Sequence, residues 1–348
     1  MSVTEPKSVD VCVFGCGPAG SSVSMRLADA GLRVLVLDRP PKTKPWGGET
    51  FTGAIQTPLK ILGLWDTFRH AGHVPGYEQR VAWGGAPWTK SSVLATEGHL
   101  WHVDRARFDQ DLRDAVLARA VEIRNYSNLQ GLEWDGEFWQ IEIDSSAQIR
   151  TRYVVDATGR ARAIARKLGV RPRIYDRLTG FTAVLPRNSN FDHSMLIEST
   201  PEGWWYAAPV PQGHVLAFFT DADLVPREVV RFMRSVAANS SFAQPESEQG
   251  WLTVGDACAA HDPLCGWGVC RALSNGILAA DAIDWYLRQG DASALDAYRN
   301  HCRDQFTSYL NGLTRHYSHE QRWTSAPFWE RRTSAPRPSA RGELHAES

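Results

Sequence analysis

The sequence predicts an α/β protein built on a parallel sheet, and three stretches support this class. Residues 11–15 form a short apolar run that leads into a glycine-rich turn, and residues 18–30 then form an amphipathic stretch. Residues 32–38 form a second continuous apolar run, as expected for a parallel strand that is buried on both faces. Residues 150–156 form a third such run, which leads into the letters DATG. With 348 residues, the chain is long enough for two domains.

The remaining elements follow in chain order. Residues 108–120 repeat apolar side chains at helical spacing. Residues 181–219 contain apolar runs and alternating patterns, which predict an antiparallel sheet inserted between parts of the nucleotide-binding domain. Residues 250–280 return to a strand, a turn and a helix, and residues 295–330 are predicted to be helical. The tail after residue 331 is rich in Pro, Ser and Ala and is expected to be mobile.

Charge and composition exclude several classes of protein. The chain has 38 Lys and Arg against 39 Asp and Glu, a formal net charge of −1, so we expect no binding to nucleic acid or to an anionic membrane. No apolar run reaches the roughly 18 residues of a membrane span, and the polar N-terminus predicts a cytoplasmic protein. The six cysteines lack Cys-x-x-Cys pairs and zinc-site spacing, so we expect reduced thiols and no metal.

Three glycines, Gly15, Gly17 and Gly20, form the pattern GxGxxG between the first strand and the first helix. The first permits a tight turn, the second lets a pyrophosphate approach the backbone, and the third lets helix and strand pack closely. The start of the helix then offers free N–H groups and a positive dipole to the phosphates. Asp38 ends the second strand, where a carboxylate can bind ribose hydroxyls, which favours FAD or NAD over NADP. A purely structural glycine turn is the alternative.

Further motifs make the chain resemble the FAD-dependent monooxygenase superfamily with the p-hydroxybenzoate hydroxylase fold, in the branch of geranylgeranyl reductases and flavin-dependent halogenases. They are GGET (residues 47–50), DRARFDQDL (104–112), DATGR (156–160) and GDACAAHDPLCGWGV (255–269). The resemblance implies a Rossmann-like FAD-binding domain with a three-layer ββα arrangement and a smaller antiparallel-sheet substrate domain. The implied boundaries are residues 1–60, 100–165 and 250–290 for the FAD-binding domain, 61–99 and 166–249 for the substrate domain, 291–330 for C-terminal helices and 331–348 for the mobile tail.

These motifs imply a set of residues that contact FAD. Arg105 resembles an arginine on the flavin side of the site, although a salt bridge beside a helix is the alternative. Asp256 resembles the carboxylate that binds the ribityl chain, and backbone N–H groups of the DPLCGWG loop can stabilise an anionic flavin. DATGR on its own could be an ordinary turn after a strand. The predicted cofactor-binding residues are Gly15, Gly17, Pro18, Ala19, Gly20, Asp38, Arg39, Gly48, Glu49, Thr50, Arg105, Asp156, Gly159, Gly255, Asp256, Pro263, Gly266, Gly268 and Val269.

The reaction is predicted from what the motifs contain and lack. No second GxGxxG is present, so NAD(P)H or a separate flavin reductase is expected to supply electrons. Reduced flavin and oxygen would then form a C4a-hydroperoxide, which hydroxylates an aromatic substrate. The stretch GWWYAAP resembles the halogenase signature WxWxIP, but Tyr206 and Ala208 replace its second Trp and its Ile. No Lys occurs in residues 61–89, between Lys60 and Lys90, which also weighs against halogenation.

Two segments, residues 204–223 and 322–332, resemble halogenase-like flavoproteins that mature tryptophan-derived quinone cofactors in amine or amino-acid oxidases. The implied substrate is a tryptophan in an oxidase precursor polypeptide. His261 and Glu49 are the candidate acid/base groups. Each has a structural alternative: His261 could be a hydrogen-bonded structural histidine, and Glu49 could be a carboxylate that anchors the flavin loop. The predicted substrate-side residues are Trp46, Trp83, Trp204, Trp205, Cys265 and Trp267.

Three other functions stay open. A tryptophan halogenase is the closest enzymatic rival. An isoprenoid-type reductase would need a long apolar tunnel. The third is a flavin-binding partner protein whose enzymatic activity has been lost, and the intact glycine and GD motifs argue against it. The tryptophans themselves could be core residues rather than the walls of a pocket.

Overall fold

A mixed sheet carries the glycine-rich turn at the end of its central strand. The computed structural model describes residues 7–39, 49–92, 98–144, 147–186, 194–244 and 250–333. In this sheet β1, β2, β8, β11 and β19 run parallel, and β10 and β9 continue it antiparallel. The bounds are β1 (Lys7–Phe14), β2 (Val34–Asp38), β8 (Glu122–Asn125), β9 (Leu129–Trp134), β10 (Trp139–Ile143), β11 (Ala147–Asp156) and β19 (Trp251–Thr253).

Burial on both faces of this sheet explains its continuous apolar runs. Val11 and Val13 belong to the core cluster on the helix side, whereas Cys12 and Phe14 belong to a second cluster on the other face. That second cluster includes Trp139 from β10, a strand of the same sheet. Successive side chains of a strand point to opposite faces, so a central strand must be apolar at every position.

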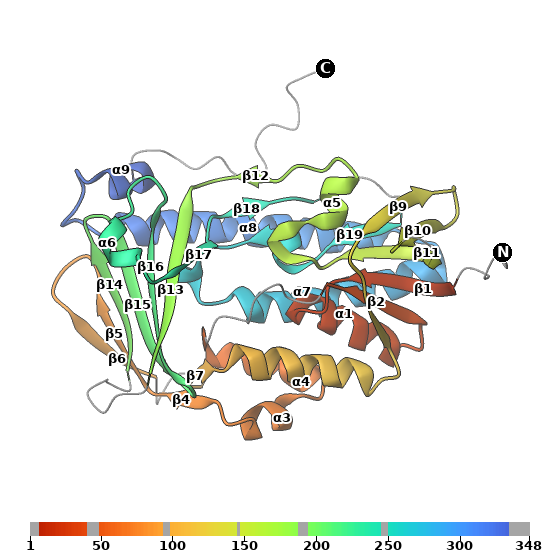
Figure 1. Ribbon diagram of the computed structural model, residues 1–348, viewed down its shortest axis with the longest axis horizontal. Coiled ribbons are helices and arrows are strands. Elements are labelled where there is room, and N and C mark those ends of the chain that lie inside the picture. Colours follow the sequence, from red (N-terminus) through yellow and green to blue (C-terminus); the bar gives the residue numbers. More distant parts are fainter. Residues whose placement is uncertain are drawn as a thin grey trace, which may run out of the picture.

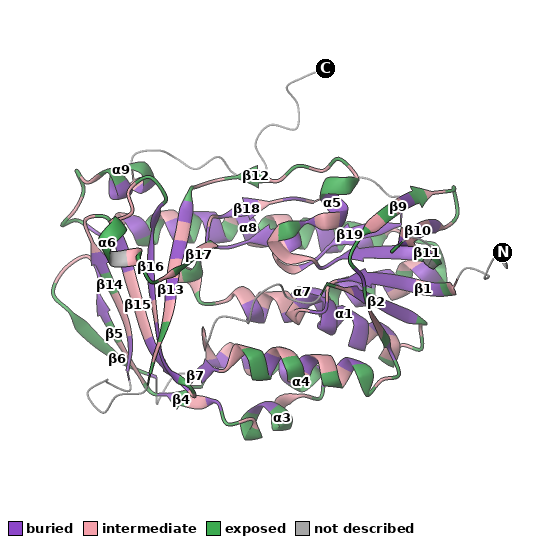
Figure 2. Cartoon of the chain, in the orientation of Figure 1, coloured by how far each residue is buried: buried purple, intermediate pink, exposed green. Residues whose placement is uncertain are grey.

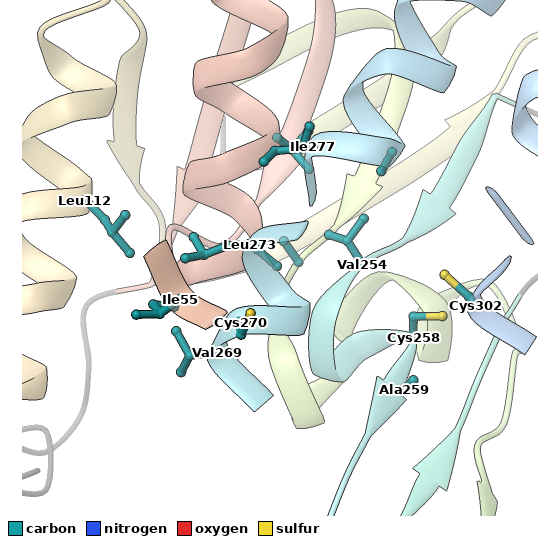
Figure 3. Packing of buried hydrophobic residues seen from close by; sticks show 14 of the residues in the cluster. Ile55, Leu112, Val254, Cys258, Ala259, Val269, Cys270, Leu273, Ile277 and Cys302 are labelled. Carbon is teal, nitrogen blue, oxygen red and sulfur yellow. The ribbon is translucent and has the colours of Figure 1, made fainter. Parts of the chain in front are cut away.

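Helices cover one face of the mixed sheet (Figure 1). They are α1 (Pro18–Asp29), α4 (Arg105–Leu117) and α7 (Gly268–Gln289). The Asp104 carboxylate accepts hydrogen bonds from the backbone N–H groups of Ala106 and Arg107 and caps α4. Leu273 and Ile277 of α7 point toward α1 (Figure 3), and both belong to the main core cluster. Helices α1 and α7 therefore pack side by side, although residues 18–29 and 268–289 lie far apart in the sequence.

A second, mostly antiparallel sheet stands at the other end of the molecule (Figure 1). Its strand order is β17-β13-β16-β15-β14-β5-β6, with β14 and β5 parallel. Trp204 of β15 lies opposite Phe219 of β16. The bounds are β5 (Glu78–Ala82), β6 (Trp88–Ser91), β13 (Leu178–Pro186), β14 (Met195–Thr200), β15 (Gly203–Val210), β16 (Gly213–Asp221) and β17 (Arg234–Ala237).

Short elements connect the two large sheets. One small sheet joins β3 (Glu49–Phe51), β7 (Leu100–Val103) and β4 (Val74–Gly76), and another joins β12 (Arg173–Ile174), β18 (Ser241–Phe242) and β20 (Ala259–Ala260). Short helices are α2 (Gln56–Ile61), α3 (Trp65–His70), α5 (Ala163–Lys167) and α6 (Arg227–Val230). The α/β class with a separate antiparallel sheet is confirmed, while the exact domain boundaries stay predictions.

The C-terminal region, predicted as helices in residues 291–330, is helical with one interruption. It contains α8 (Ser293–Ser318) and α9 (Pro327–Thr333), separated by an irregular segment. Pro327 is the first residue of α9, where proline is tolerated, and between the two helices Glu320 turns inward, where Arg322 and Ser199 hydrogen-bond to it. Figure 2 shows the buried side of α9, where Phe328 and Trp329 are fully buried. Among the described residues, no helix is long and apolar enough to span a bilayer.

Candidate active site

The first cavity lies at the end of β1, where the glycine-rich turn meets α7. Its volume is about 380 Å³. Three turns of the chain that are distant in sequence enclose it: residues 15–19, 157–159 and 254–256, together with the start of α7. It is lined by Gly15, Cys16, Gly17, Pro18, Ala19, Asp38, Glu49, Arg105, Ala157, Thr158, Gly159, Val254, Asp256, Gly268, Val269 and Ala272.

Gly15 and Gly20 allow the backbone segments to approach each other closely. Gly15 has φ +100°, and a Cβ there would lie 2.5 Å from the carbonyl oxygen of Ala157. A Cβ at Gly20 would lie 1.9 Å from the carbonyl oxygen of Gly15. Side chains at either position would therefore separate β1 from α1 or from the Ala157 turn.

Gly17 and Gly268 instead face open space. An ideal Cβ at either glycine has no heavy atom within 4 Å, and both residues line the first cavity. Each stands at the start of a helix, α1 and α7, where backbone N–H groups lack intrahelical partners. A phosphate or an anionic ring can approach both helix starts, so these residues fit an FAD molecule.

Asp38 is positioned for a ribose by its neighbours. One carboxylate oxygen accepts the Cys16 N–H at 3.2 Å, and the other is 2.6 Å from an Arg113 nitrogen. The ion pair holds the carboxylate at the rim of the first cavity. Arg113 was not among the residues that the sequence singled out, although its place on the helix of DRARFDQDLR could have suggested it.

Asp156 differs from its predicted role as a cofactor contact. Its side chain is fully buried, and it accepts hydrogen bonds from the Thr158 N–H and Oγ1 and from the N–H groups of Ile164 and Ala165. These donors use its oxygens within the protein, so Asp156 shapes the turn while Gly159 lines the cavity. Likewise, a Cβ at Gly255 would lie 2.7 Å from the Cβ of Ala19, which indicates a packing role.

Two other predicted contacts are more exposed. The Asp256 carboxylate lines the first cavity and lies 3.4 Å from the Arg160 guanidinium. Arg39 lies over the ring of Tyr126, with 4.8 Å between the guanidinium carbon and the ring centroid.

The second cavity adjoins the first and lies against the antiparallel sheet. Its volume is about 750 Å³. Strands β3, β14, β15 and β16, the hairpin of β5 and β6, and the loop after Asp262 supply its walls. It is lined by Glu49, Thr50, Thr52, Gly53, Gln79, Lys90, Ser91, Ser92, Gly98, Leu100, Met195, Ile197, Trp204, Tyr206, Phe219, Pro263, Leu264, Cys265, Gly266 and Trp267.

Glu49 lines both cavities and so marks their junction. It is ion-paired with Arg105, which also contacts Asp109 at 3.1 Å. Burial alone would lower the pKa of Arg105, but Glu49 and Asp109 raise it, so the guanidinium stays charged. The loop of residues 263–269 also borders both cavities, because residues 263–267 line the second and residues 268–269 the first.

Asp262 fixes the start of this loop. One oxygen accepts the Leu264 N–H at 2.9 Å, and the other accepts the Tyr317 hydroxyl at 2.8 Å. Burial, and then the nearby Asp176, raise the pKa of Asp262 to about 6. Tyr317 in turn accepts the Trp204 indole N–H at 3.1 Å. The loop is thereby connected to the wall of the second cavity.

The predicted tryptophans separate into different environments. Trp204 lines the second cavity and stacks on Phe219 with ring centroids 4.1 Å apart. Trp205 points to the opposite face of the same sheet, where it packs on Phe218, because neighbouring side chains of a strand alternate. Trp83 packs behind Trp204 rather than lining the cavity. Trp205 and Trp83 therefore do not form the predicted substrate wall, while Cys265 and Trp267 do lie in the lining.

His261 lies apart from both cavities. Its ring packs edge-on against Tyr309 and Phe306, at centroid distances of 4.5 and 5.5 Å. Burial, and then Arg271 and Arg160, lower the pKa of His261 well below its usual value. This placement contradicts the predicted role of His261 as an acid/base group, because a group that donates or accepts a proton must reach the substrate. Two predicted site residues, Trp46 and Gly48, lie outside the described residues.

Two groups that the sequence did not single out as candidates lie at the second cavity. Tyr206 lines it, and its hydroxyl is 2.6 Å from Thr50 Oγ1, which is 2.7 Å from Nδ1 of His102. Lys90 also lines it. Tyr206 had been noted only as a departure from the halogenase signature, and its cross-strand partners could not be read from the sequence.

Known proteins share this architecture. A model of the FAD binding domain family matches residues 8–229. A protein from Marinomonas mediterranea named as an FAD-dependent oxidoreductase, LodB, is 28% identical over 94% of this chain and 97% of its own length. A brominase of pyrrole-2-carbonyl groups on a peptidyl carrier protein, from Pseudoalteromonas luteoviolacea, is 26% identical over 81% of this chain and 78% of its own.

Solved structures agree on the fold. The myxobacterial chondrochloren halogenase CndH superposes with a TM-score of 0.81 at 21% identity, over 94% of this chain and 86% of its own. The peptidyl tryptophan dihydroxylase QhpG superposes with a TM-score of 0.73 at 22% identity, over 93% of this chain and 78% of its own. With the family match and the two adjoining cavities, the chain belongs to the FAD binding domain family and is an FAD-dependent oxidoreductase of the monooxygenase and halogenase type.

Proposed function

We propose that this protein is a monooxygenase that hydroxylates an indole ring, and that the indole belongs to a tryptophan of a polypeptide. The observation that carries the proposal is the junction at Glu49 and residues 263–269, where the FAD-binding cavity adjoins an aromatic-walled cavity of about 750 Å³. Sites for small aromatic groups commonly have volumes of this order. A ring held there would lie beside the cofactor site.

Reduced FAD, when bound, supplies activated oxygen, and the residues of this chain control what the oxygen meets. Gly17, Gly268 and Asp38 would hold the cofactor. Trp204 and Phe219 form an apolar wall that orients an aromatic ring and excludes water. A family of this kind needs a source of reduced flavin, and we propose a flavin reductase or NAD(P)H.

The polypeptide substrate is supported by a likeness to one solved structure. QhpG, which shares the fold, is described as a peptidyl tryptophan dihydroxylase essential for tryptophylquinone cofactor biogenesis. We propose a corresponding role here, with an oxidase precursor as the substrate.

Halogenation is the second candidate, and Lys90 is the observation that favours it. The sequence left residues 61–89 without a lysine, yet the structure brings Lys90 of β6 to the lining of the second cavity. Its ammonium group could hold an anionic oxidant near an aromatic ring. The brominase likeness supports the same alternative.

One experiment separates the two candidates. FAD-loaded protein, a flavin reductase and oxygen are incubated with a tryptophan-containing peptide of the precursor, with free tryptophan, or with either substrate plus bromide. We expect mass spectrometry to show added oxygen on the peptide and little change of the free amino acid. Efficient bromination would contradict hydroxylation, and preference for free tryptophan would contradict a polypeptide substrate.

A further inference from the structure

We propose that Tyr206, Thr50 and His102 form a relay that removes the ring proton from the hydroxylated indole and stores it on His102. The inference rests on the proposed function, because it assigns the proton acceptor of that reaction. It replaces His261, which lies outside both cavities, as the group that receives the proton.

The three side chains form one continuous hydrogen-bonded row across three strands. The Tyr206 hydroxyl of β15 lies 2.6 Å from Thr50 Oγ1, and Thr50 Oγ1 lies 2.7 Å from Nδ1 of His102. Thr50 of β3 and His102 of β7 are direct cross-strand partners, so the sheet fixes their separation. Tyr206 and Thr50 line the second cavity, whereas His102 lies behind them, fully buried. The row therefore leads from the cavity into the protein.

His102 has the surroundings of a proton store rather than of a structural anchor. Its Nε2 is buried and has no hydrogen-bond partner in the part of the chain that the structure describes. Gly76 gives it room, since a Cβ there would lie 2.4 Å from this Nε2. Unpartnered buried polar atoms are rare and carry a free-energy cost, which a functional role explains. Nδ1 of His102 therefore carries the hydrogen bond to Thr50, while Nε2 has no partner among the described residues.

The charge state of His102 suits an acceptor. Burial, and then the neighbouring His214, lower the pKa of His102 to about 4, so the imidazole is neutral at pH 7. With the hydrogen on Nε2, Nδ1 is free to accept from the Thr50 hydroxyl, which in turn accepts from Tyr206. This is the arrangement that can take up one proton from the cavity.

The transfer balances in atoms and electrons. The indole carbon would take an OH group from the activated oxygen as the O–O bond breaks, and the oxygen left behind would keep that electron pair. The attacked carbon is then bonded to both hydrogen and oxygen, with a positive charge on the ring. The C–H bond breaks, and its electron pair restores the aromatic ring. The proton passes to the Tyr206 oxygen as the phenol hydrogen moves to Thr50 Oγ1 and the threonine hydrogen moves to Nδ1 of His102. A cationic ring is a strong acid, so an imidazole of low basicity is a sufficient acceptor.

Glu49 is the competing base, because it lines the same cavity. Its carboxylate is ion-paired with Arg105, which holds it toward the guanidinium. Glu49 also marks the junction with the cofactor cavity, so its replacement would disturb both sites. The test therefore changes the relay and leaves Glu49 in place.

The test compares Tyr206→Phe, Thr50→Val and Thr50→Ser in the FAD-loaded protein, with Tyr77→Phe as a matched control on an exposed tyrosine. The substrate is the precursor peptide, either normal or deuterated at the ring carbon that is hydroxylated. We expect Y206F and T50V to lower the rate of product formation by about 10²-fold, the usual contribution of a positioned proton acceptor. We also expect these two variants to show a primary deuterium effect that the wild type lacks, because ring-proton removal becomes rate-limiting. T50S, which keeps the hydroxyl, should recover most of the loss seen in T50V.

The outcomes separate the relay from the proposed function. Flavin content and melting temperature first show that each variant folds and binds FAD. Wild-type rates without a deuterium effect in Y206F would overturn the relay, as would equal losses in T50S and T50V. A wild-type protein that hydroxylates no indole would instead overturn the proposed function on which the relay rests.

Discussion

The two cavities are built from different parts of the chain. Backbone forms a large part of the first: Gly17 and Gly268 offer open space at two helix starts, and Gly15 and Gly20 let the surrounding segments pack closely. The second is bounded mostly by side chains that project from strands and loops. The shape of the first cavity depends on a few glycines, whereas the wall of the second cavity changes with any substitution of a lining residue.

Under the proposed function, the first cavity binds the cofactor and the second selects the substrate. The first cavity can be retained throughout a family that acts on many molecules, because its donors are main-chain N–H groups. The second can be altered residue by residue, as the exchange of a signature Trp for Tyr206 illustrates. Changes in the first cavity should therefore abolish flavin binding, and changes in the second should leave it intact.

Gly17→Val is the largest expected effect. Its side chain would enter open space in the first cavity, so the protein should fold, yet FAD should bind about 10²-fold more weakly because the side chain occupies ligand volume. The loss of FAD binding is measured as flavin absorbance of the purified protein. Gly85→Val is the control, since a Cβ at Gly85 also meets nothing within 4 Å but lies outside the first cavity. Unchanged flavin in G17V would contradict the assignment of the first cavity.

Glu320→Gln tests whether the buried Glu320 carboxylate stabilises the strands behind the second cavity. Glu320 accepts the Gly84 N–H at 2.8 Å, the Ser199 hydroxyl at 2.5 Å and an Arg322 N–H at 2.7 Å. Loss of this buried charge should lower the free energy of unfolding by about 3 kcal/mol. Flavin content at low temperature should not change. Glu330→Gln, at an exposed position of α9, should have little effect in the same denaturant titrations.

The contribution of Glu320 to the free energy of unfolding should depend on pH in one direction. Burial would raise the pKa of Glu320, but hydrogen bonds from Arg322, Ser199 and Gly84 lower it to about 2. A carboxyl with a lowered folded-state pKa stabilises the protein above its unfolded value, 4.5, and loses that contribution as the pH falls toward 2. The stability difference between wild type and E320Q should therefore shrink across this range. A difference that grew toward low pH would contradict the hydrogen-bonded, ionised state.

Trp204→Phe and Trp205→Phe give the smallest and most specific contrast. The two residues are neighbours on β15, but only Trp204 faces the second cavity. W204F makes the aromatic wall smaller and removes the indole N–H that Tyr317 accepts, so the peptide should pack less well against the wall and KM should rise by up to about tenfold, equivalent to about 1.4 kcal/mol. W205F should leave KM unchanged. Equal effects of both variants would show that the wall of the cavity is assigned wrongly.

The sequence predicted the first cavity far better than the second. GxGxxG and Asp38 lie on consecutive elements, so local spacing shows their chemistry, and the class of fold and the cofactor are confirmed. The second cavity depends on which strands pair. Thr50 meets Tyr206 only because β3 and β15 come together, and no local pattern encodes a contact between residues this far apart in the chain.

The wrong predictions have the same physical origin. His261 and Asp156 occur in motifs beside the cofactor, but proximity in sequence does not decide whether a side chain points to a cavity or into the core. Trp205 was grouped with Trp204, although alternation along a strand sends adjacent side chains to opposite faces. Strand alternation could have separated these two from the sequence, but the facing partner of His261, Tyr309, could not have been predicted.

The most direct test of the central claim uses isotopically labelled oxygen gas. The protein, loaded with FAD and supplied with a reductase, is incubated with the precursor polypeptide, and the peptides are sequenced by mass spectrometry. We expect labelled oxygen on a specific tryptophan ring, and none when FAD binding is abolished by G17V. A polypeptide that stays unlabelled while the wild-type enzyme consumes oxygen and reduced flavin would contradict it.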